Sequence, residues 1–420
     1  MSTMDVTDAR FANLSLKSVV LLIFCCCTCL CFTRRDGNVT KGHPVIILPG
    51  DGGTQLWASL DKPSTVHYFC RQKEALFNLW LNVEELTPLT IDCFVDNARL
   101  VFNNVTKHTS DSPGVNVTTV NFGNTSSVEY LDPSHISLSK YFDGIVAALV
   151  AVGYQRGVSV RGAPYDFRKA PNEANVYFQN VTKLIEETYR INQNRKVVLL
   201  THSMGGLYGL YYLNSQPQEW KDKFIQAYAP ISAPWGGATK SIRVVVSGDN
   251  VGDVVVHAST VRKAQRTWPS IYYLMPSDKF WNPKEVIVET PKKNYTVADY
   301  QTLLKDINYE IGWEMRQAAM DQVYDLKAPG VPVYGIHGCD VPTEEHYVYD
   351  SSRPFPDYEP HITYGQGDGT VNMRSLKGYL KWQKEQQHPV SEFQIPGGEH
   401  VAILQNATLH KYLIKTILHL

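Results

Sequence analysis

Short apolar runs alternate with segments of helical hydrophobic spacing along most of the chain. Five runs, at residues 45–48, 197–200, 225–231, 331–336 and 393–395, have the length and continuity of buried strands. Between the first two runs, apolar positions from Val176 to Tyr189 keep helical spacing, and Asn172 stands where a helix N-cap is expected. The segment from Val401 is also expected to be helical. This alternation predicts an α/β fold with a doubly wound, mostly parallel sheet.

Two stretches break the alternation and are interpreted as insertions carried on loops of the sheet. The first covers residues 67–105, and the second covers residues 241–330. The second is rich in aromatic and charged residues, which favours a cap or lid over a site. The predicted core then consists of residues 41–66, 106–240 and 331–420.

Length and charge narrow the class of protein. A chain of 420 residues that is 43% apolar can form one large domain with insertions. Its 40 basic and 41 acidic side chains give a formal net charge of -1, so no basic excess is available for nucleic acid phosphates. Nucleic acid is therefore not expected as a partner, and the sequence leaves the oligomeric state open.

The N-terminal segment has the character of a targeting sequence. Residues 14–32 are apolar except near Lys17, and Arg10 and Arg34 flank them, which predicts a secretory signal peptide over residues 1–32. No small-x-small cleavage site is visible, so an uncleaved signal anchor stays an alternative. Beyond the targeting segment, seven Asn-x-Ser/Thr sequons support exposure to the secretory lumen. They lie at Asn38, Asn104, Asn116, Asn124, Asn180, Asn294 and Asn406, of which Asn104, Asn294 and Asn406 are the predicted glycosylation sites.

Three cysteines lie beyond the targeting segment. Cys70 and Cys93 enclose a short loop and are natural disulfide partners in a secretory compartment, which leaves Cys339 unpaired. No cysteine or histidine spacing resembles a zinc site, and no metal or other cofactor is predicted.

Ser203 is the candidate nucleophile. It lies in Thr201-His202-Ser203-Met204-Gly205, which matches the nucleophile elbow of α/β hydrolases except that threonine replaces the first glycine. An apolar run precedes this motif and helical spacing follows it, as a strand-turn-helix elbow requires. A serine hydroxyl becomes nucleophilic only when a base takes its proton and a carboxylate orients that base.

Asp368 and His400 are the candidate acid and base, because partners in this fold follow the serine in the order acid, then histidine. Asp368 lies among glycines in Gly367-Asp368-Gly369, and His400 follows the predicted strand at 393–395. His202 is too close to Ser203 along the chain to serve as its base and is interpreted as packing support. The backbone N-H of Met204 and a donor from Asp51, in the glycine loop after the first strand, are the predicted oxyanion hole.

A stripe of apolar residues lies between Cys70 and Cys93. Leu76, Leu79, Trp80, Val83 and Leu86 recur at helical spacing, and Phe77 and Leu81 widen the apolar face. Such a stripe packs into a core or inserts into a membrane surface, and both interpretations stay open from spacing alone.

Several motifs together resemble the lecithin:cholesterol acyltransferase family over nearly the whole chain after residue 42. They are Pro49-Gly50-Asp51, Leu60-Asp61-Lys62-Pro63, Arg161-Gly162-Ala163-Pro164-Tyr165-Asp166, His202-Ser203-Met204-Gly205, Ala233-Pro234-Trp235-Gly236-Gly237, Gly367-Asp368-Gly369-Thr370-Val371 and Glu399-His400. The resemblance implies an α/β-hydrolase core with a Ser203, Asp368 and His400 triad. It also implies a membrane-binding subdomain closed by Cys70 and Cys93, with Leu76, Phe77, Leu79, Trp80 and Leu81 at the lipid surface.

The activity implied by this resemblance is calcium-independent release of fatty acyl chains from glycerophospholipids. The acyl group would pass to water or to a lipid alcohol such as a short-chain ceramide, in the lysosome lumen or outside the cell. Asp51 favours a member that works at acidic pH, because an ionised carboxylate beside the substrate carbonyl would repel the developing oxyanion. The alternatives are a membrane-anchored phospholipid:diacylglycerol or sterol acyltransferase, and a catalytically dead hydrolase that binds lipid.

Overall fold

The computed structural model describes residues 42–250, 256–320 and 325–420. The predicted targeting segment and the sequon at Asn38 lie outside these residues. Within them, no helix combines the length and the apolar character that a membrane crossing requires.

The centre of the fold is a six-stranded sheet in which all neighbouring strands are parallel. Its order is β15-β12-β9-β8-β1-β7, and the predicted α/β fold with a parallel sheet is confirmed. All five predicted strands belong to it, whereas β7 is too short to form an apolar run and was not predicted. The strands are β1 (Val45–Leu48), β7 (Val160–Gly162), β8 (Val197–His202), β9 (Ile225–Ile231), β12 (Val333–Cys339) and β15 (Val390–Pro396).

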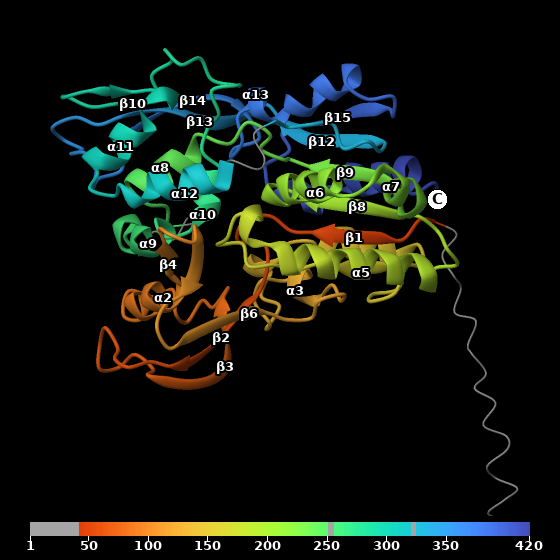
Figure 1. Ribbon diagram of the computed structural model, residues 1–420, viewed down its shortest axis with the longest axis horizontal. Coiled ribbons are helices and arrows are strands. Elements are labelled where there is room, and N and C mark those ends of the chain that lie inside the picture. Colours follow the sequence, from red (N-terminus) through yellow and green to blue (C-terminus); the bar gives the residue numbers. More distant parts are fainter. Residues whose placement is uncertain (1–41, 251–255, 321–324) are drawn as a thin grey trace, which may run out of the picture. The chain divides into compact units, whose positions relative to one another are not determined.

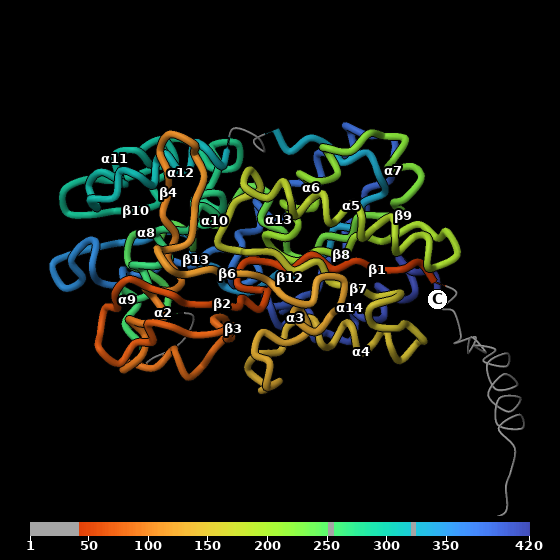
Figure 2. Tube along the Cα trace, turned by 60° about the horizontal axis from the view of Figure 1, so that its bottom comes forward, coloured from red at the N-terminus to blue at the C-terminus, as the bar shows by residue number. Residues whose placement is uncertain are grey.

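Successive residues of the central strands pack into two different clusters of buried side chains. In β1, Ile46 and Leu48 face one cluster while Val45 and Ile47 face the other, as the period of two in a strand requires. Helices α5 (Asn175–Ile191), α6 (Met204–Ser215) and α7 (Gln218–Phe224) cover the first face. Helices α4 (Asp143–Ala151) and α14 (Ala407–Tyr412) cover the second (Figure 2).

Two local predictions meet different outcomes. The capping role of Asn172 is wrong, because α5 begins at Asn175 and Asn172 lies in the preceding 3-10 turn η2 (Pro171–Glu173). Pro171 starts that turn, and the turn takes the place of a side-chain cap. The terminal segment is helical as predicted, but in three pieces: η5 (Ala402–Gln405), α14 and the π-helical turn η6 (Leu413–Ile417).

The first predicted insertion contributes one strand, β3, to an antiparallel sheet separate from the central one, and the residues on either side of the insertion contribute the other two strands (Figure 1). Strand β3 (Lys73–Trp80) pairs with β2 (Leu56–Asp61), which pairs in turn with β6 (Val115–Thr119). The helical interpretation of the apolar stripe is therefore wrong, since Leu76, Leu79 and Trp80 lie in a strand. Their spacing fits a helix, but the backbone N-H and C=O groups of this segment form hydrogen bonds with β2. Two irregularities in the register interrupt the alternation of inward and outward side chains that would have marked a strand. Helix α2 (Ile91–Ala98) and the hairpin of β4 (Leu100–Asn103) and β5 (His108–Asp111) complete this part.

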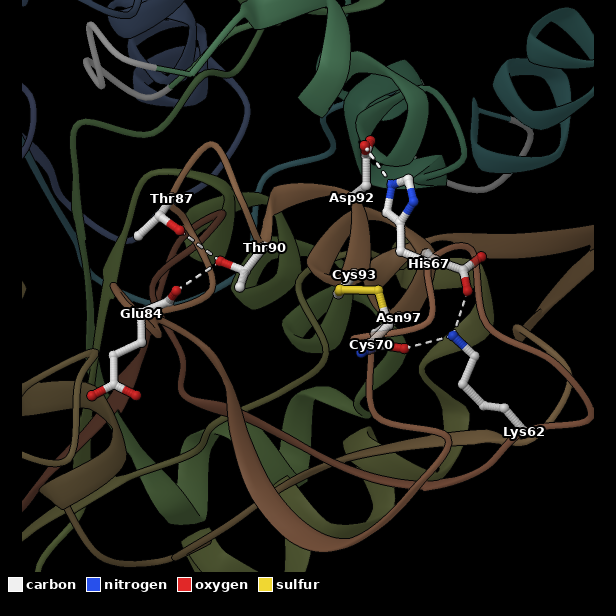
Figure 3. The surroundings of a disulfide bond; sticks show 10 residues. Lys62, His67, Cys70, Glu84, Thr87, Thr90, Asp92, Cys93 and Asn97 are labelled. Atoms are coloured by element: carbon white, nitrogen blue, oxygen red, sulfur yellow. Dashed lines mark hydrogen bonds and ion pairs between the residues drawn. A yellow bond between two sulfur atoms is a disulfide. The ribbon is translucent and has the colours of Figure 1, made fainter.

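A disulfide joins Cys70 to Cys93, as predicted, with their Cα atoms 5.5 Å apart (Figure 3). It connects the segment before β3 to helix α2. Nearby, the buried Lys62 forms an ion pair with Asp96 and donates a hydrogen bond of 2.9 Å to Asn97 Oδ1, both on α2. The disulfide thus links two parts of the insertion to each other, and Lys62, directly after β2, links helix α2 to the end of that strand.

The second insertion is mainly helical and continues into a four-stranded sheet of order β11-β10-β13-β14. Its helices are α8 (Lys240–Val246), α9 (Ala258–Gln265), α10 (Pro269–Tyr273), η3 (Val297–Asp299), α11 (Tyr300–Asp306) and α12 (Ile311–Met320). The strands of the sheet are β10 (Val288–Glu289), β11 (Asn294–Tyr295), β13 (Val341–Val348) and β14 (His361–Gly367). The remaining short helices are α3 (Ser126–Glu129), η1 (Ser137–Ser139), α13 (Met373–Leu376) and η4 (Gly378–Lys384).

Candidate active site

The structure brings the predicted Ser203, Asp368 and His400 together. His400 Nε2 lies 2.9 Å from Ser203 Oγ, and His400 Nδ1 lies 2.8 Å from Asp368 Oδ2. Ser203 connects β8 to α6, Asp368 directly follows β14, and His400 lies on the loop after β15. This is the geometry in which an imidazole can take a proton from a serine hydroxyl while a carboxylate holds the imidazole.

The backbone at Ser203 has the strained conformation of a nucleophile elbow. Its φ is 54° and its ψ is -130°, a region that non-glycine residues seldom occupy. The glycines after it are required by close packing, because a Cβ on Gly205 would lie 2.2 Å from the carbonyl oxygen of Pro49. A Cβ on Gly206 would lie 2.4 Å from Cβ of Ala233. The strain and the close packing hold the serine hydroxyl at the end of the strand.

Thr201 replaces the glycine that usually begins this motif, and the helix accommodates it. A Cβ added to Gly209 would lie 3.2 Å from Cγ2 of Thr201, in tight contact. A Cβ on Gly206 would lie 3.6 Å from Oγ1 of Thr201, at ordinary contact distance. The extra side chain of the strand thus fills space that glycines on α6 leave open, and the motif keeps its shape.

Asp368 is buried and ionised. Burial acts to raise its pKa, but the neighbouring His400 and hydrogen bonds from the amides of Val371 and Thr370 outweigh that effect, and the pKa is lowered. A carboxylate at this position accepts a hydrogen bond from the Nδ1-H of His400. The other ring nitrogen of His400 is then the acceptor that faces Ser203.

The two residues predicted to form an oxyanion hole, Met204 and Asp51, belong to segments that meet at Ser203. Met204 is the first residue of α6, so its N-H has no acceptor one turn earlier in the helix. The glycine loop after β1 lies directly against the elbow, since a Cβ on Gly50 would be 2.7 Å from Cβ of Ser203. Asp51 follows Gly50 in this loop. Sequence reasoning had selected both Met204 and Asp51.

The pKa of Asp51 is raised to about 7, mainly because protein atoms surround the carboxyl group. A hydrogen bond from the Gly52 amide and the charge of Lys240 oppose this rise, and Asp249 adds to it. The side chain also reaches solvent, which screens its charge and moderates the shift. The carboxyl group is thus more easily protonated than an ordinary aspartate.

His202 does not act on Ser203 but packs behind it. Its ring is buried, and burial lowers its pKa to about 3, so the ring is neutral. Nε2 lies 2.8 Å from the carbonyl oxygen of His400, and Nδ1 lies 2.5 Å from the hydroxyl of Tyr141. Tyr141 was not found by sequence reasoning, because nothing in its local sequence marks it as a neighbour of the elbow.

The five predicted membrane-binding residues do not share one exposed face. Leu76 is 52% exposed, whereas Leu79 is fully buried in the core. Phe77, Trp80 and Leu81 are half-buried, and Trp80 Nε1 donates a hydrogen bond of 2.7 Å to the carbonyl oxygen of Gly52 in the glycine loop after β1. Other apolar side chains of this insertion are more exposed, among them Tyr68 at 98% and Leu89 at 70%.

Other predicted residues have clear surroundings. Cys339 is a buried free thiol. Asn104 and Asn294 are exposed, and Asn406 is partly exposed with its side-chain oxygen capping α14, so its amide nitrogen is not used in the cap. Trp235 is buried and lines a pocket together with Leu207, Tyr273, Met275 and Met320. Among the residues described, no three His, Cys, Asp or Glu side chains are grouped to hold a metal ion.

The parallel sheet, the strained elbow and the Ser-His-Asp arrangement together define an α/β-hydrolase-fold enzyme with a serine nucleophile site. The family model of lecithin:cholesterol acyltransferase matches residues 76–407. The chain is 46% identical over 376 residues to the human protein named lysosomal phospholipase A and acyltransferase, covering 89% of this chain and 90% of that protein. It is 40% identical over 368 residues to chicken phosphatidylcholine-sterol acyltransferase, covering 87% and 88%. The chain belongs to the lecithin:cholesterol acyltransferase family, which confirms the resemblance seen in the sequence.

Proposed function

We propose that this enzyme is a calcium-independent phospholipase A and transacylase that works through an acyl-Ser203 intermediate. The observation that carries the proposal is the pair of hydrogen bonds made by His400, which accepts from the Ser203 hydroxyl over 2.9 Å and donates to Asp368 over 2.8 Å. The 46% identity to lysosomal phospholipase A and acyltransferase supports a glycerophospholipid as the acyl donor.

In the proposed reaction, Ser203 Oγ attacks the ester carbonyl of the phospholipid while His400 Nε2 takes the hydroxyl proton. The negative oxygen of the tetrahedral intermediate accepts hydrogen bonds from the N-H groups of Met204 and Asp51. His400 then gives its proton to the departing lysophospholipid alcohol, and the acyl chain stays on Ser203. Water or a lipid alcohol such as a short-chain ceramide, deprotonated by His400, attacks next and releases a fatty acid or an acylated alcohol.

The enzyme is proposed to be most active at acidic pH because of Asp51. With a pKa raised to about 7, the carboxyl group is neutral in a lysosome-like environment and ionised in mildly alkaline solution. A neutral group beside the oxyanion does not repel it, whereas a carboxylate does. The acyl-transfer rate should therefore rise as the pH falls from mildly alkaline values to below neutrality.

Lysosomal or secreted localisation and contact with a phospholipid surface belong to the same proposal. The Cys70–Cys93 disulfide fits an oxidising compartment, and exposed sequons at Asn104 and Asn294 offer sites for glycans. Residues 67–105 form the proposed membrane-binding subdomain, residues 241–330 form the proposed cap, and the rest of the mature chain forms the core. The exposed Tyr68, Leu76 and Leu89 are better placed than Leu79 to enter lipid.

The test uses purified protein with phosphatidylcholine liposomes that contain N-acetylsphingosine, at pH 4.5 and pH 8. Free fatty acid and acylated N-acetylsphingosine should both form at pH 4.5, in the presence of EDTA, and Ser203→Ala should form neither. Diacylglycerol or cholesterol in place of N-acetylsphingosine tests the alternative acceptors. Acyl release by Ser203→Ala at the wild-type rate would refute the proposal.

A further inference from the structure

A chain of buried hydrogen bonds links three loops that meet at Ser203. The Gly50 N-H donates to the hydroxyl oxygen of Tyr141 over 3.0 Å, and that hydroxyl lies 2.5 Å from His202 Nδ1. His202 Nε2 lies 2.8 Å from the carbonyl oxygen of His400. Gly50 belongs to the oxyanion loop, His202 to the elbow and His400 to the loop after β15, so a single chain of polar contacts spans all three.

The direction of each hydrogen bond follows from the chemistry of its partners. A carbonyl oxygen only accepts, so Nε2 of His202 carries a hydrogen and donates it to His400. His202 is neutral, because burial lowers its pKa and the adjacent His400 ring lowers it further, against smaller opposing effects of the hydrogen bond to the His400 carbonyl and of Asp368. Nδ1 is then an acceptor, and the Tyr141 hydroxyl donates to it. The same hydroxyl accepts from the Gly50 N-H, so every polar group of the chain has a partner.

These hydrogen bonds connect two loops whose strands, β8 and β15, are not neighbours in the sheet. Strand β15, which carries the His400 loop, is separated from β8 by β12 and β9 in the sheet order. The loop must nevertheless hold Nε2 of His400 within hydrogen-bonding distance of Ser203. The His202 and His400 rings lie 4.8 Å apart, so the contact fixes the His400 backbone directly behind the elbow.

We propose that Tyr141 and His202 are positioning residues that hold the oxyanion loop and the His400 loop in register with Ser203. Neither touches the reacting atoms. The inference rests on the proposed serine chemistry, since it assigns Tyr141 and His202 to the alignment of that same site. Small displacements at such sites are costly, because an error of about 1 Å in position reduces rates by roughly 100-fold. Loss of either residue should therefore lower the rate of the chemical step by about 10- to 100-fold.

The control for this proposal is Tyr154→Phe. Tyr154 is buried in the same hydrophobic cluster, and its hydroxyl donates a hydrogen bond of 2.7 Å to the carbonyl oxygen of His43, away from the triad. The change Tyr154→Phe removes one buried hydroxyl, as Tyr141→Phe does. A general effect of losing a buried hydrogen bond would appear in both variants, whereas a positioning effect would appear only in Tyr141→Phe.

The experiment measures the second-order rate at which a soluble fluorophosphonate labels Ser203, together with kcat and KM on a soluble ester. Rates are normalised to the number of sites that the fluorophosphonate finally labels, so loss of folded protein does not count as loss of rate. Tyr141→Phe and His202→Asn should label about 10- to 100-fold more slowly than wild type, with lower kcat and nearly unchanged KM. His202→Gln should lose less than His202→Asn, because its longer amide can still donate to the His400 carbonyl.

The two residues should also act as one unit. The double variant Tyr141→Phe/His202→Asn should label no more than about twofold more slowly than the slower single variant. Labelling of Tyr141→Phe and His202→Asn within twofold of wild type and Tyr154→Phe would overturn the proposal, and so would a double variant whose losses multiply. The fluorophosphonate needs no phospholipid, so the result is independent of the donor lipid. Unlabelled wild-type protein would instead contradict the proposed role of Ser203.

Discussion

The change Asp51→Asn tests whether one carboxyl group sets the pH dependence of this enzyme. Asparagine has nearly the same size and keeps the backbone N-H that is proposed to face the oxyanion, but it cannot ionise. If the pKa of Asp51 is about 7, the neutral fraction is about 0.99 at pH 5 and about 0.09 at pH 8. Wild-type kcat/KM should then fall about 10-fold from this ionisation between pH 5 and pH 8. Contact of the carboxyl group with solvent moves the midpoint somewhat below 7.

The assay is kcat/KM on a short soluble ester from pH 4.5 to 8.5, so that membrane binding does not contribute. Asp51→Asn should lose the alkaline decline, because asparagine cannot ionise. Asp222→Asn, an exposed change on α7, is the control and should keep the wild-type profile. An Asp51→Asn variant with the wild-type decline above pH 7 would refute this explanation.

Stability gives a second test of the same group. The folded-state pKa of Asp51 is raised above its unfolded value of about 3.9, so the folded state binds the proton more tightly. The contribution of Asp51 to the free energy of unfolding is therefore fully present below pH 4 and is lost as the pH rises toward 7. The Tm of Asp51→Asn should exceed that of wild type by more at pH 8 than at pH 4.

Three further predictions concern the elbow and the first insertion. Gly205→Ala should reduce kcat/KM by at least about 100-fold. The added Cβ would lie 2.2 Å from the carbonyl oxygen of Pro49 and push the oxyanion loop away from Ser203. Activity above a tenth of wild type would contradict this prediction. Thr201→Gly should lower the free energy of unfolding by about 1–2 kcal/mol, measured by urea titration, while activity stays within a few-fold of wild type. The double change Cys70→Ser/Cys93→Ser opens a link between residues 23 apart and should lower that free energy by about 3 kcal/mol, with soluble-ester hydrolysis kept; an unchanged urea midpoint would show that the disulfide does not stabilise the fold.

The sequence predicted the structure best where a local apolar run, or the order of residues along the chain, is enough to identify a feature. The runs in β1 and β8 are buried on both sides, so continuous apolar character identified them. The order of Ser203, Asp368 and His400 selected three residues that the fold brings together, although β14 and β15 lie far along the chain from β8.

Sequence reasoning failed where tertiary pairing decides the structure. The stripe around Leu76 and Leu79 fits a helix by spacing, but its pairing with β2 makes it a strand and buries Leu79. Tyr141 lies 61 residues before His202 and contacts it only through the packing of α4 and its preceding loop against the sheet. No local pattern reports a contact of that kind.

The most direct test of the account is to identify the residue that carries the acyl group. The enzyme is mixed with a palmitoyl phospholipid at pH 4.5, and the reaction is quenched with acid within one turnover. The protein is then digested, and the masses of its peptides are measured by mass spectrometry. The account predicts a palmitoyl group on Ser203 in the wild-type enzyme and none in Ser203→Ala, which also releases no fatty acid. An acyl group on another residue, or turnover by Ser203→Ala at the wild-type rate, would contradict it.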